Sequence, residues 1–155
     1  MNNQNVLALD LATKTGWAVR LRDGSVHSGT YDASSKSDHA GQRFVNFRRF
    51  LVDLIGKYDV QHVVYEDVRR HVSNTSAHVH GGLKAIMLMI CCQSNVPVSF
   101  KGVGTIKKHW TGKGNASKEQ MVSAARKRGY NPFDDNEADA LAILSLALNE
   151  YGVIV

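Results

Sequence analysis

Two short apolar runs in this chain each end on a carboxylate. Asp10 closes the run 6–9, and Glu66 closes the run 62–65, which is rich in β-branched and aromatic residues. Runs of this length, bounded by turn-forming residues, predict buried strands. A carboxylate at the tip of a buried strand needs a partner, because an unpaired charge is costly to remove from water.

A third apolar segment, residues 135–148, opens with acids. Its apolar residues recur at helical spacing, so Asp135 and Asp139 project from one face of the first turns of a helix. Acids gathered from two strands and a helix repel one another unless divalent cations lie among them, and such hard oxygen ligands suit Mg²⁺ or Mn²⁺. The alternative, exposed caps and turn residues, fits Asp135 better than Asp10 or Glu66.

The remaining pattern predicts a mixed α/β fold with a five-stranded sheet flanked by helices. Asp23-Gly24 between two alternating runs is a strong hairpin signal, so the chain opens with three consecutive antiparallel strands. At 155 residues we expect one domain, residues 1–155. We expect strands at 6–10, 16–22, 25–31, 62–66 and 97–100, helices at 38–57, 75–93, 116–128 and 135–148, and a helical turn at 105–110.

The helix expected at 75–93 contains the pair Gly81-Gly82. Two glycines lower its intrinsic helix propensity by on the order of 2 kcal/mol, so something must offset them. Because glycines permit close backbone approach, this helix is a candidate for packing against a second subunit. A kink or a later helix start is the alternative.

The charge balance indicates a polyanionic partner. Nineteen Lys and Arg against fourteen Asp and Glu give a net charge of +5, and eight of the 28 residues from Lys101 to Arg128 are basic. Acids that bind metal would leave the remaining surface still more basic. A solvated charged face is the alternative.

The cysteines, the apolar runs and the first residues of the sequence indicate the cellular compartment. The two cysteines, Cys91 and Cys92, are adjacent and follow an apolar run, which favours buried thiols in a reducing compartment. The apolar runs are too short to span a bilayer, and the polar start lacks the apolar core of a signal peptide. We therefore expect a cytoplasmic protein with no membrane partner, in the bacterial host if a phage encodes it.

Three motifs together resemble the RuvC-type Holliday junction resolvases, especially their bacteriophage branch. They are DLATKTGWA at 10–18, VYEDV at 64–68 and DNEADALA at 135–142, in the family's order and spacing. The resemblance spans nearly the whole chain. It implies a ribonuclease H-like fold, a homodimer, and paired metal-dependent nicks in four-way DNA junctions.

The resemblance carries the family's catalytic acids onto Asp10, Glu66 and Asp139. The fourth acid stands three residues before the last aspartate in the better-known bacterial members, where this chain has Asn136. We assign the fourth position to Asp135, with Asn136 or Glu137 as substitutes.

Hydrolysis of a phosphodiester explains why such an acid cluster is required. Two metal ions about 4 Å apart activate the attacking oxygen and stabilise the leaving oxygen, so no side chain needs to be the nucleophile. We expect two Mg²⁺ ions per active site, with Mn²⁺ able to substitute, and Asp10 bridging both.

The resemblance also assigns the family's two functional lysines to Lys107 and Lys118. Lysines here hold phosphates without reading sequence, so DNA affinity should depend on salt. For Lys108 and Lys113, phosphate contact and a solvated surface role stay equally open. The stretch mimics a phosphate loop, but Lys107 and Gly114 stand where that motif needs Gly and Ser or Thr, so ATP binding is disfavoured.

One departure from the family concerns sequence preference. Bacterial members carry an aromatic residue three positions after the catalytic glutamate, whereas this chain has Arg69, followed by Arg70. Arginine can stack on a base or grip a phosphate. We predict DNA contact by both residues and a looser cleavage preference.

Three functions follow from the sequence in decreasing order of support. The first is a homodimeric nuclease that resolves four-way junctions. The second is a broader nuclease of the same fold, acting on forks, flaps or RNA-DNA hybrids. The third is a junction-binding protein that does not cut because Asn136 replaces the fourth acid.

Overall fold

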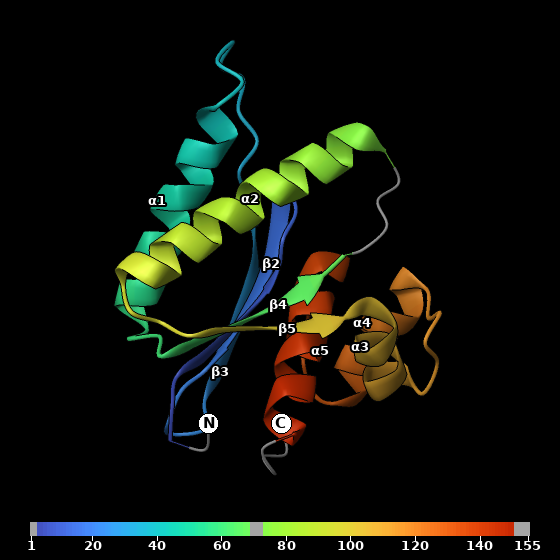
Figure 1. Ribbon diagram of the computed structural model, residues 1–155. Coiled ribbons are helices and arrows are strands. Elements are labelled where there is room, and N and C mark those ends of the chain that lie inside the picture. Colours follow the sequence, from blue (N-terminus) through green and yellow to red (C-terminus); the bar gives the residue numbers. More distant parts are fainter. Residues whose placement is uncertain (1–2, 69–72, 151–155) are drawn as a thin grey trace.

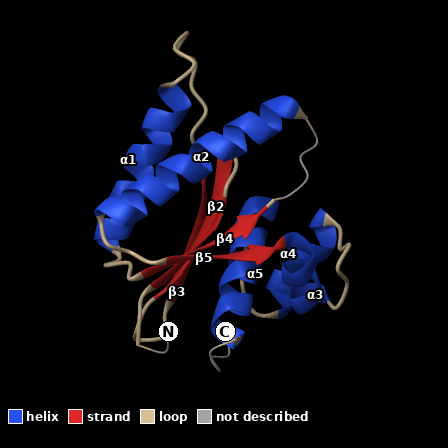
Figure 2. Cartoon of the chain, viewed as in Figure 1, coloured by secondary structure: helices blue, strands red, loops and turns tan. Residues whose placement is uncertain are grey.

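The computed structural model describes residues 3–68 and 73–150. Its elements alternate as the sequence pattern predicts (Figures 1 and 2). The strands are β1 (Val6–Asp10), β2 (Lys14–Arg20), β3 (Val26–Asp32), β4 (His62–Asp67) and β5 (Val98–Gly102). The helices are α1 (Gln42–Lys57), α2 (Asn74–Gln93), α3 (Val103–Thr111), α4 (Lys118–Lys127) and α5 (Asp135–Asn149).

The five strands form one mixed sheet in the order β3-β2-β1-β4-β5. The first three are antiparallel, as the Asp-Gly hairpin signal indicates, while β4 runs parallel to both β1 and β5. The mixed α/β architecture is confirmed. Because β1 and β4 are parallel neighbours, their carboxyl ends meet at one edge of the sheet.

Helices cover both faces of the sheet, with α1 and α2 on one side and α5, backed by α3 and α4, on the other (Figure 1). Side chains of β1 alternate between the two layers. Leu7 and Leu9 belong to the buried cluster under α1 and α2, whereas Val6 and Ala8 belong to the cluster under α5. Burial on both faces explains why β1 is a continuous apolar run.

Three helices have bounds that differ from the sequence expectation. Helix α1 begins at Gln42, four residues after the predicted start at 38. Hydroxyls of Ser35 and Ser37 accept bonds from backbone N–H groups two residues on, and such local bonds compete with helix formation. Helix α4 begins at Lys118, with Ser117 as its N-cap in a reciprocal capping box. The predicted turn after β5 is the full helix α3.

The glycine pair of α2 allows close packing within the chain. A Cβ at Gly82 would lie 2.5 Å from the Phe44 ring of α1, whereas one at Gly81 would meet nothing within 4 Å. Helix α2 is continuous from Asn74, so the later start is wrong. Gly82 lets the two helices of this layer approach each other, and this contact offsets its low helix propensity.

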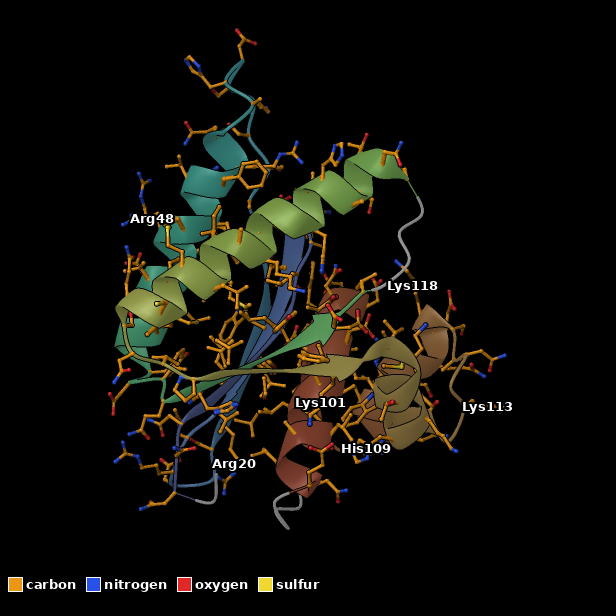
Figure 3. The ribbon with its side chains drawn as sticks, in the orientation of Figure 1. Arg20, Arg48, Lys101, His109, Lys113 and Lys118 are labelled. Carbon is orange, nitrogen blue, oxygen red and sulfur yellow. The ribbon has the colours of Figure 1, made fainter. Side chains whose placement is uncertain are left out.

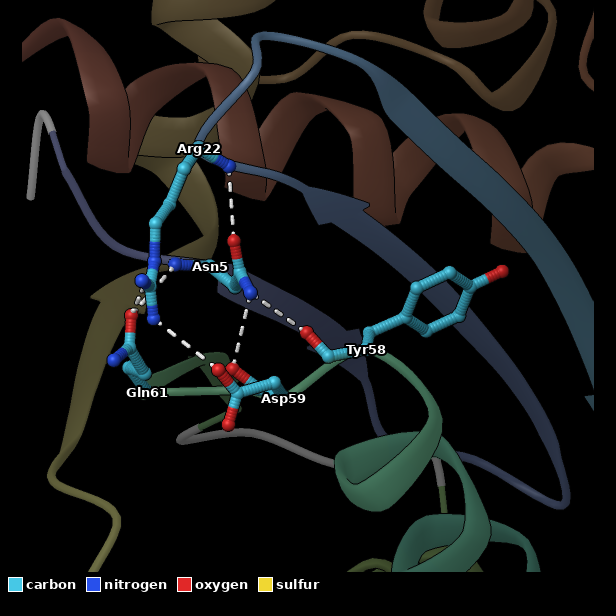
Figure 4. A network of polar contacts seen from close by, with 5 residues as sticks. All are labelled: Asn5, Arg22, Tyr58, Asp59 and Gln61. Atoms are coloured by element: carbon cyan, nitrogen blue, oxygen red, sulfur yellow. Dashed lines mark hydrogen bonds and ion pairs between the residues drawn. The ribbon is translucent and has the colours of Figure 1, made fainter.

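A polar network fixes the end of β1 opposite Asp10 (Figure 4). The Asn5 side chain donates to the carbonyls of Tyr58 and Asp59 and accepts from the Arg22 backbone. Arg22 in turn pairs with Asp59 at 3.1 Å. These contacts join the start of β1 to the α1–β4 connection, so the two parallel strands are held in register from this end.

No helix in the described ranges is long and apolar enough to cross a membrane.

Candidate active site

The parallel pairing of β1 and β4 brings two predicted acids together. The register pairs Leu9 with Tyr65, so the next residues, Asp10 and Glu66, lie at the same edge of the sheet. Both are half-buried because helices cover the sheet on either side. Two carboxylates at one partly buried edge repel each other unless protons or cations intervene.

The first turn of helix α5 lies directly against this edge of the sheet, because β2 has a glycine at the point of contact. Asp10 pairs with Gly16 of β2, and a Cβ added to Gly16 would overlap the backbone carbonyl of Asn136. Only a residue without a side chain lets the first turn of α5 lie against the strand here. The close approach sets the distance of Asp135 and Asp139 from Asp10.

A set of side-chain hydrogen bonds from β3 holds the start of α5. Thr30 Oγ1 donates to Asp134 Oδ1 at 2.6 Å, and Ser28 Oγ donates to Glu137 Oε1 at 2.7 Å. Asp134 caps the helix by accepting from the Glu137 N–H, and Glu137 Oε2 accepts from the Phe133 N–H at 2.8 Å. We call these five residues the α5 clamp. The clamp fixes both the position and the rotation of the helix that carries Asp135 and Asp139.

The electrostatics of the edge are those of a crowded acid cluster. Burial raises the pKa of Asp10 well above its ordinary value, and the charges of Glu66, Asp139 and Asp135 raise it further. Lys118 acts in the opposite direction. The other three predicted acids therefore all lie within electrostatic range of Asp10.

The pKa values of two further carboxyl groups are raised by burial and by neighbouring charges. Burial, and then the charge of Asp139, raises the pKa of Glu66 to about 7. Burial, and then the charge of Asp135, raises the pKa of Asp139 to about 6. Asp139 Oδ1 is also buried without a hydrogen-bond partner among the residues that the structure describes. A buried, unpaired carboxylate oxygen calls for a cation.

The two predicted lysines lie with the acids. Lys118 Nζ pairs with Asp135 Oδ2 at 2.6 Å, and it projects from the start of α4 toward the upper end of α5 (Figure 3). Lys107 Nζ donates to the Ala116 carbonyl at 3.0 Å, and its charge lowers the pKa of both Glu66 and Asp139. Lys107 and Lys118 thus partly neutralise the cluster.

The other predicted DNA contacts are more distant or lie outside the described residues. Lys108 and Lys113 are exposed, and Lys113 borders a separate cavity of about 510 Å³ between α3 and α4. Arg69 and Arg70 fall outside the described ranges.

The three alternatives for the fourth acid are in different surroundings. Asp135 acts electrostatically on Asp10 and Asp139. The Asn136 side chain donates to Asp134 at 3.4 Å, and both oxygens of Glu137 are engaged in the α5 clamp. The geometry therefore favours Asp135 over Asn136 and Glu137.

The residues present fit a divalent cation. They supply hard carboxylate oxygens, one of them buried and unpaired, and these are the donors that Mg²⁺ and Mn²⁺ take. Within the described ranges, no three acidic, histidine or cysteine side chains converge closely enough to enclose an ion. One of the four acids, Asp135, is already paired with a cation, the Nζ of Lys118.

A mixed sheet in this order, with acids at the tips of adjacent central strands and on the facing helix, defines the ribonuclease H-like class of nuclease folds. The family model "Crossover junction endodeoxyribonuclease RuvC" matches residues 9–146. This chain belongs to the RuvC family.

Individual relatives and a solved structure are consistent with this family assignment. The RuvC protein of Anaplasma phagocytophilum is 30% identical over 152 residues, covering 90% of this chain and 93% of the relative. That of Ruegeria pomeroyi is 27% identical over 143 residues, covering 89% and 87%. Thermus thermophilus RuvC, solved in complex with a Holliday junction substrate, has the same fold, with a TM-score of 0.79 and 22% identity over 96% of both chains.

Sequence reasoning missed the α5 clamp and considered Glu137 only as a metal ligand. Asp134 before a helix is a recognisable N-cap signal, so that residue could have been found. Ser28 and Thr30 carried no such signal, because their partners lie more than 100 residues away in the sequence.

Proposed function

We propose that this protein is a metal-dependent endonuclease that resolves four-way DNA junctions by paired phosphodiester nicks. The observation that carries the proposal is the acid cluster of Asp10, Glu66, Asp135 and Asp139, gathered at one sheet edge in a chain of the RuvC family. The proposal treats residues 1–155 as one nuclease domain. Its formal net charge of +5 suits a polyanionic substrate.

In this proposal Asp10, Glu66, Asp135 and Asp139 would hold two Mg²⁺ ions, which Mn²⁺ could replace. Such ions would supply activation of a water and neutralisation of the leaving oxygen during in-line displacement. The protein orients the carboxylates through the α5 clamp and the Gly16 contact, so less reorganisation is needed when substrate arrives.

Lys107 and Lys118 are proposed to hold the scissile and flanking phosphates. Both already lie beside the acids, and a phosphate that displaces Asp135 from Lys118 would free that carboxylate for metal. Substrate and metal binding would then support each other. Lys108, Lys113, Arg69 and Arg70 are proposed as further backbone contacts, which add affinity without reading sequence.

Metal affinity is expected to fall steeply as the pH is lowered. Carboxylates must be ionised to bind metal, and the pKa values of Glu66 and Asp139 are raised to about 7 and about 6. Below pH 7 protons compete with the ion. The apparent affinity should drop by up to about tenfold per pH unit for each proton displaced.

Calorimetric titration of the DNA-free protein with Mn²⁺ between pH 5.5 and 8.5 checks this expectation. Buffers of different ionisation enthalpy report the protons released. An affinity that is flat across this range, with no proton release, would contradict the assignment of Glu66 and Asp139 as ligands.

Paired nicks require two active sites, and we propose that α2 forms the homodimer interface. One side of this helix exposes Gly81, Ala85, the adjacent pair Leu88 and Met89, and Cys92, at intervals of three or four residues. The expectation of two buried thiols is therefore wrong for Cys92, while Cys91 is buried. Leu88 and Met89 are 42% and 44% exposed. An apolar stripe on a helix already packed on its other side is suited to a second copy, and Gly81 would permit close approach.

The double substitution Leu88→Glu with Met89→Glu is expected to make the protein monomeric. Burying unpaired carboxylates in an apolar interface costs several kcal/mol, and about 3 kcal/mol weakens dimerisation by roughly a hundredfold. Sedimentation velocity measures the change, with Val52→Glu on the exposed side of α1 as a matched control. Dissociation by the control alone would place the interface on α1.

The proposed function is tested with an immobile four-way junction in Mg²⁺. Linear duplex, fork, flap and RNA-DNA hybrid substrates are run beside it, with Asp139→Asn as the metal-site control. We expect symmetric nicks confined to the junction and absent in the control. Junctions with a randomised centre should be cut with a loose sequence preference.

Other outcomes have distinct meanings. Comparable cutting of forks, flaps or hybrids would replace the proposal with a broader nuclease of the same fold. Tight junction binding in Mg²⁺ without product would indicate a binding protein whose fourth acid is lost at Asn136.

A further inference from the structure

A cavity of about 600 Å³ opens beside Asp10, on the face of the sheet away from Lys107 and Lys118. Its described wall consists of the loop after β1, Lys14 at the start of β2, Arg43 of α1, Val68 after β4 and the first residues of α2 with Ser73 before them. The two lysines come from α3 and α4, which lie on the opposite side of the sheet (Figure 1). Asp10 therefore stands between a basic surface on one face and this cavity on the other.

The polar lining of the cavity is arranged for an anion. Arg43 Nη1 donates to Thr13 Oγ1 at 3.3 Å, which holds the half-buried guanidinium at the wall. Within residues 3–68 and 73–150, its other N–H groups stay open to a ligand. Thr75 and Ser76, at the start of α2, and Lys14 line the same space. Among the described lining residues, Asp10 is the single carboxylate.

We propose that this cavity binds the backbone phosphate adjacent to the scissile phosphate on the cleaved strand, with Arg43 as the main contact. This rests on the proposed junction-resolving function. A strand whose scissile phosphate lies at Asp10, between the lysines and the cavity, continues across the edge of the sheet. Its next phosphate then enters a space lined by the guanidinium of Arg43 and by polar residues of α2.

Arginine suits this role better than a surface lysine. Its planar fork donates two parallel hydrogen bonds to a phosphate, and the Thr13 contact limits the rotamer freedom lost on binding. A contact of this kind fixes the strand's direction through the site. It thereby aligns one phosphate of the junction strand for in-line attack.

The test combines a protein variant with a modified substrate. Junction affinity is measured in Ca²⁺ as a function of salt for the wild type, Arg43→Gln, Arg43→Lys and Arg48→Gln. Arg48 is an exposed residue on the outer side of α1 (Figure 3) and serves as the matched control. Each protein is also tested on junctions with one neutral methylphosphonate next to the scissile phosphate.

Loss of one phosphate contact should lower the slope of log K against log salt by about 1 for Arg43→Gln. Arg43→Lys should keep the wild-type slope, because it keeps the charge. The methylphosphonate should weaken binding by the wild type and by Arg48→Gln but have no further effect on Arg43→Gln. Unchanged thermal unfolding of Arg43→Gln excludes a folding defect.

Failures of the two proposals can be told apart. A wild type that neither binds nor cuts the junction would overturn both. Normal junction cleavage with equal losses from the methylphosphonate in the wild type and Arg43→Gln would overturn the phosphate site alone. A loss of salt slope in Arg43→Gln without dependence on the neighbouring phosphate would also overturn it, because it would indicate a different phosphate as the occupant.

Discussion

Gly16→Ala is expected to abolish junction cleavage and to destabilise the fold by about 2–4 kcal/mol. The added Cβ would overlap the backbone carbonyl of Asn136. A backbone atom cannot rotate away as a side chain can, so the first turn of α5 must move from the sheet or unwind. Either change would carry Asp135 and Asp139 away from Asp10, and misplacement by about 1 Å alone can cost on the order of a hundredfold in rate.

Denaturant unfolding and cleavage rates measure the two effects. Gly56→Ala in α1 is the matched control, because a Cβ there meets nothing within 4 Å, and it should stabilise the helix by up to about 1 kcal/mol. Gly16→Ala protein with wild-type stability and activity would show that α5 does not need this close approach.

Asp139→Asn is expected to reduce cleavage by about 10³-fold or more while making the metal-free protein more stable at neutral pH. The rate should fall because a proposed metal ligand is lost, and bound metal compensates several kcal/mol of transition-state charge. Stability rises because burial and the charge of Asp135 raise the pKa of Asp139 to about 6. The neutral amide removes that unfavourable ionisation.

The sign of the stability change follows from proton binding. An acid whose pKa is higher in the folded than in the unfolded state binds more protons when folded, so the wild-type free energy of unfolding falls as pH rises from about 4 to about 6. Asp139→Asn should lack this contribution and be more stable at pH 7.5 by about 1–3 kcal/mol.

Urea unfolding at pH 4.5 and 7.5, in EDTA and in Mg²⁺, measures this difference. Mg²⁺ should stabilise the wild type by mass action and stabilise Asp139→Asn much less. The exposed Asp53→Asn on α1 provides a charge-matched control that should behave as the wild type. Equal or lower stability of Asp139→Asn at pH 7.5 would argue that Asp139 is satisfied in the folded protein without metal.

The sequence by itself determined the elements and the location of the acids along them. The run before Asp10 is apolar throughout because both faces of β1 are buried, and the recurrence of apolar residues after Asp135 identifies α5. These are local signals, since residues that repeat every two or every 3.6 positions share a face whatever the rest of the chain does. The mixed sheet and the gathering of Asp10 with Glu66 followed from them.

Only the tertiary structure decided how α5 is seated and which neighbours its acids have. The choice among Asp135, Asn136 and Glu137 depends on helix rotation, which Ser28 and Thr30 set from across the fold. The glycine pair of α2 looked like one feature, yet Gly82 packs on Phe44 while Gly81 stays open. Such contacts join residues far apart in sequence, and their geometry depends on how whole layers pack, which no local pattern encodes.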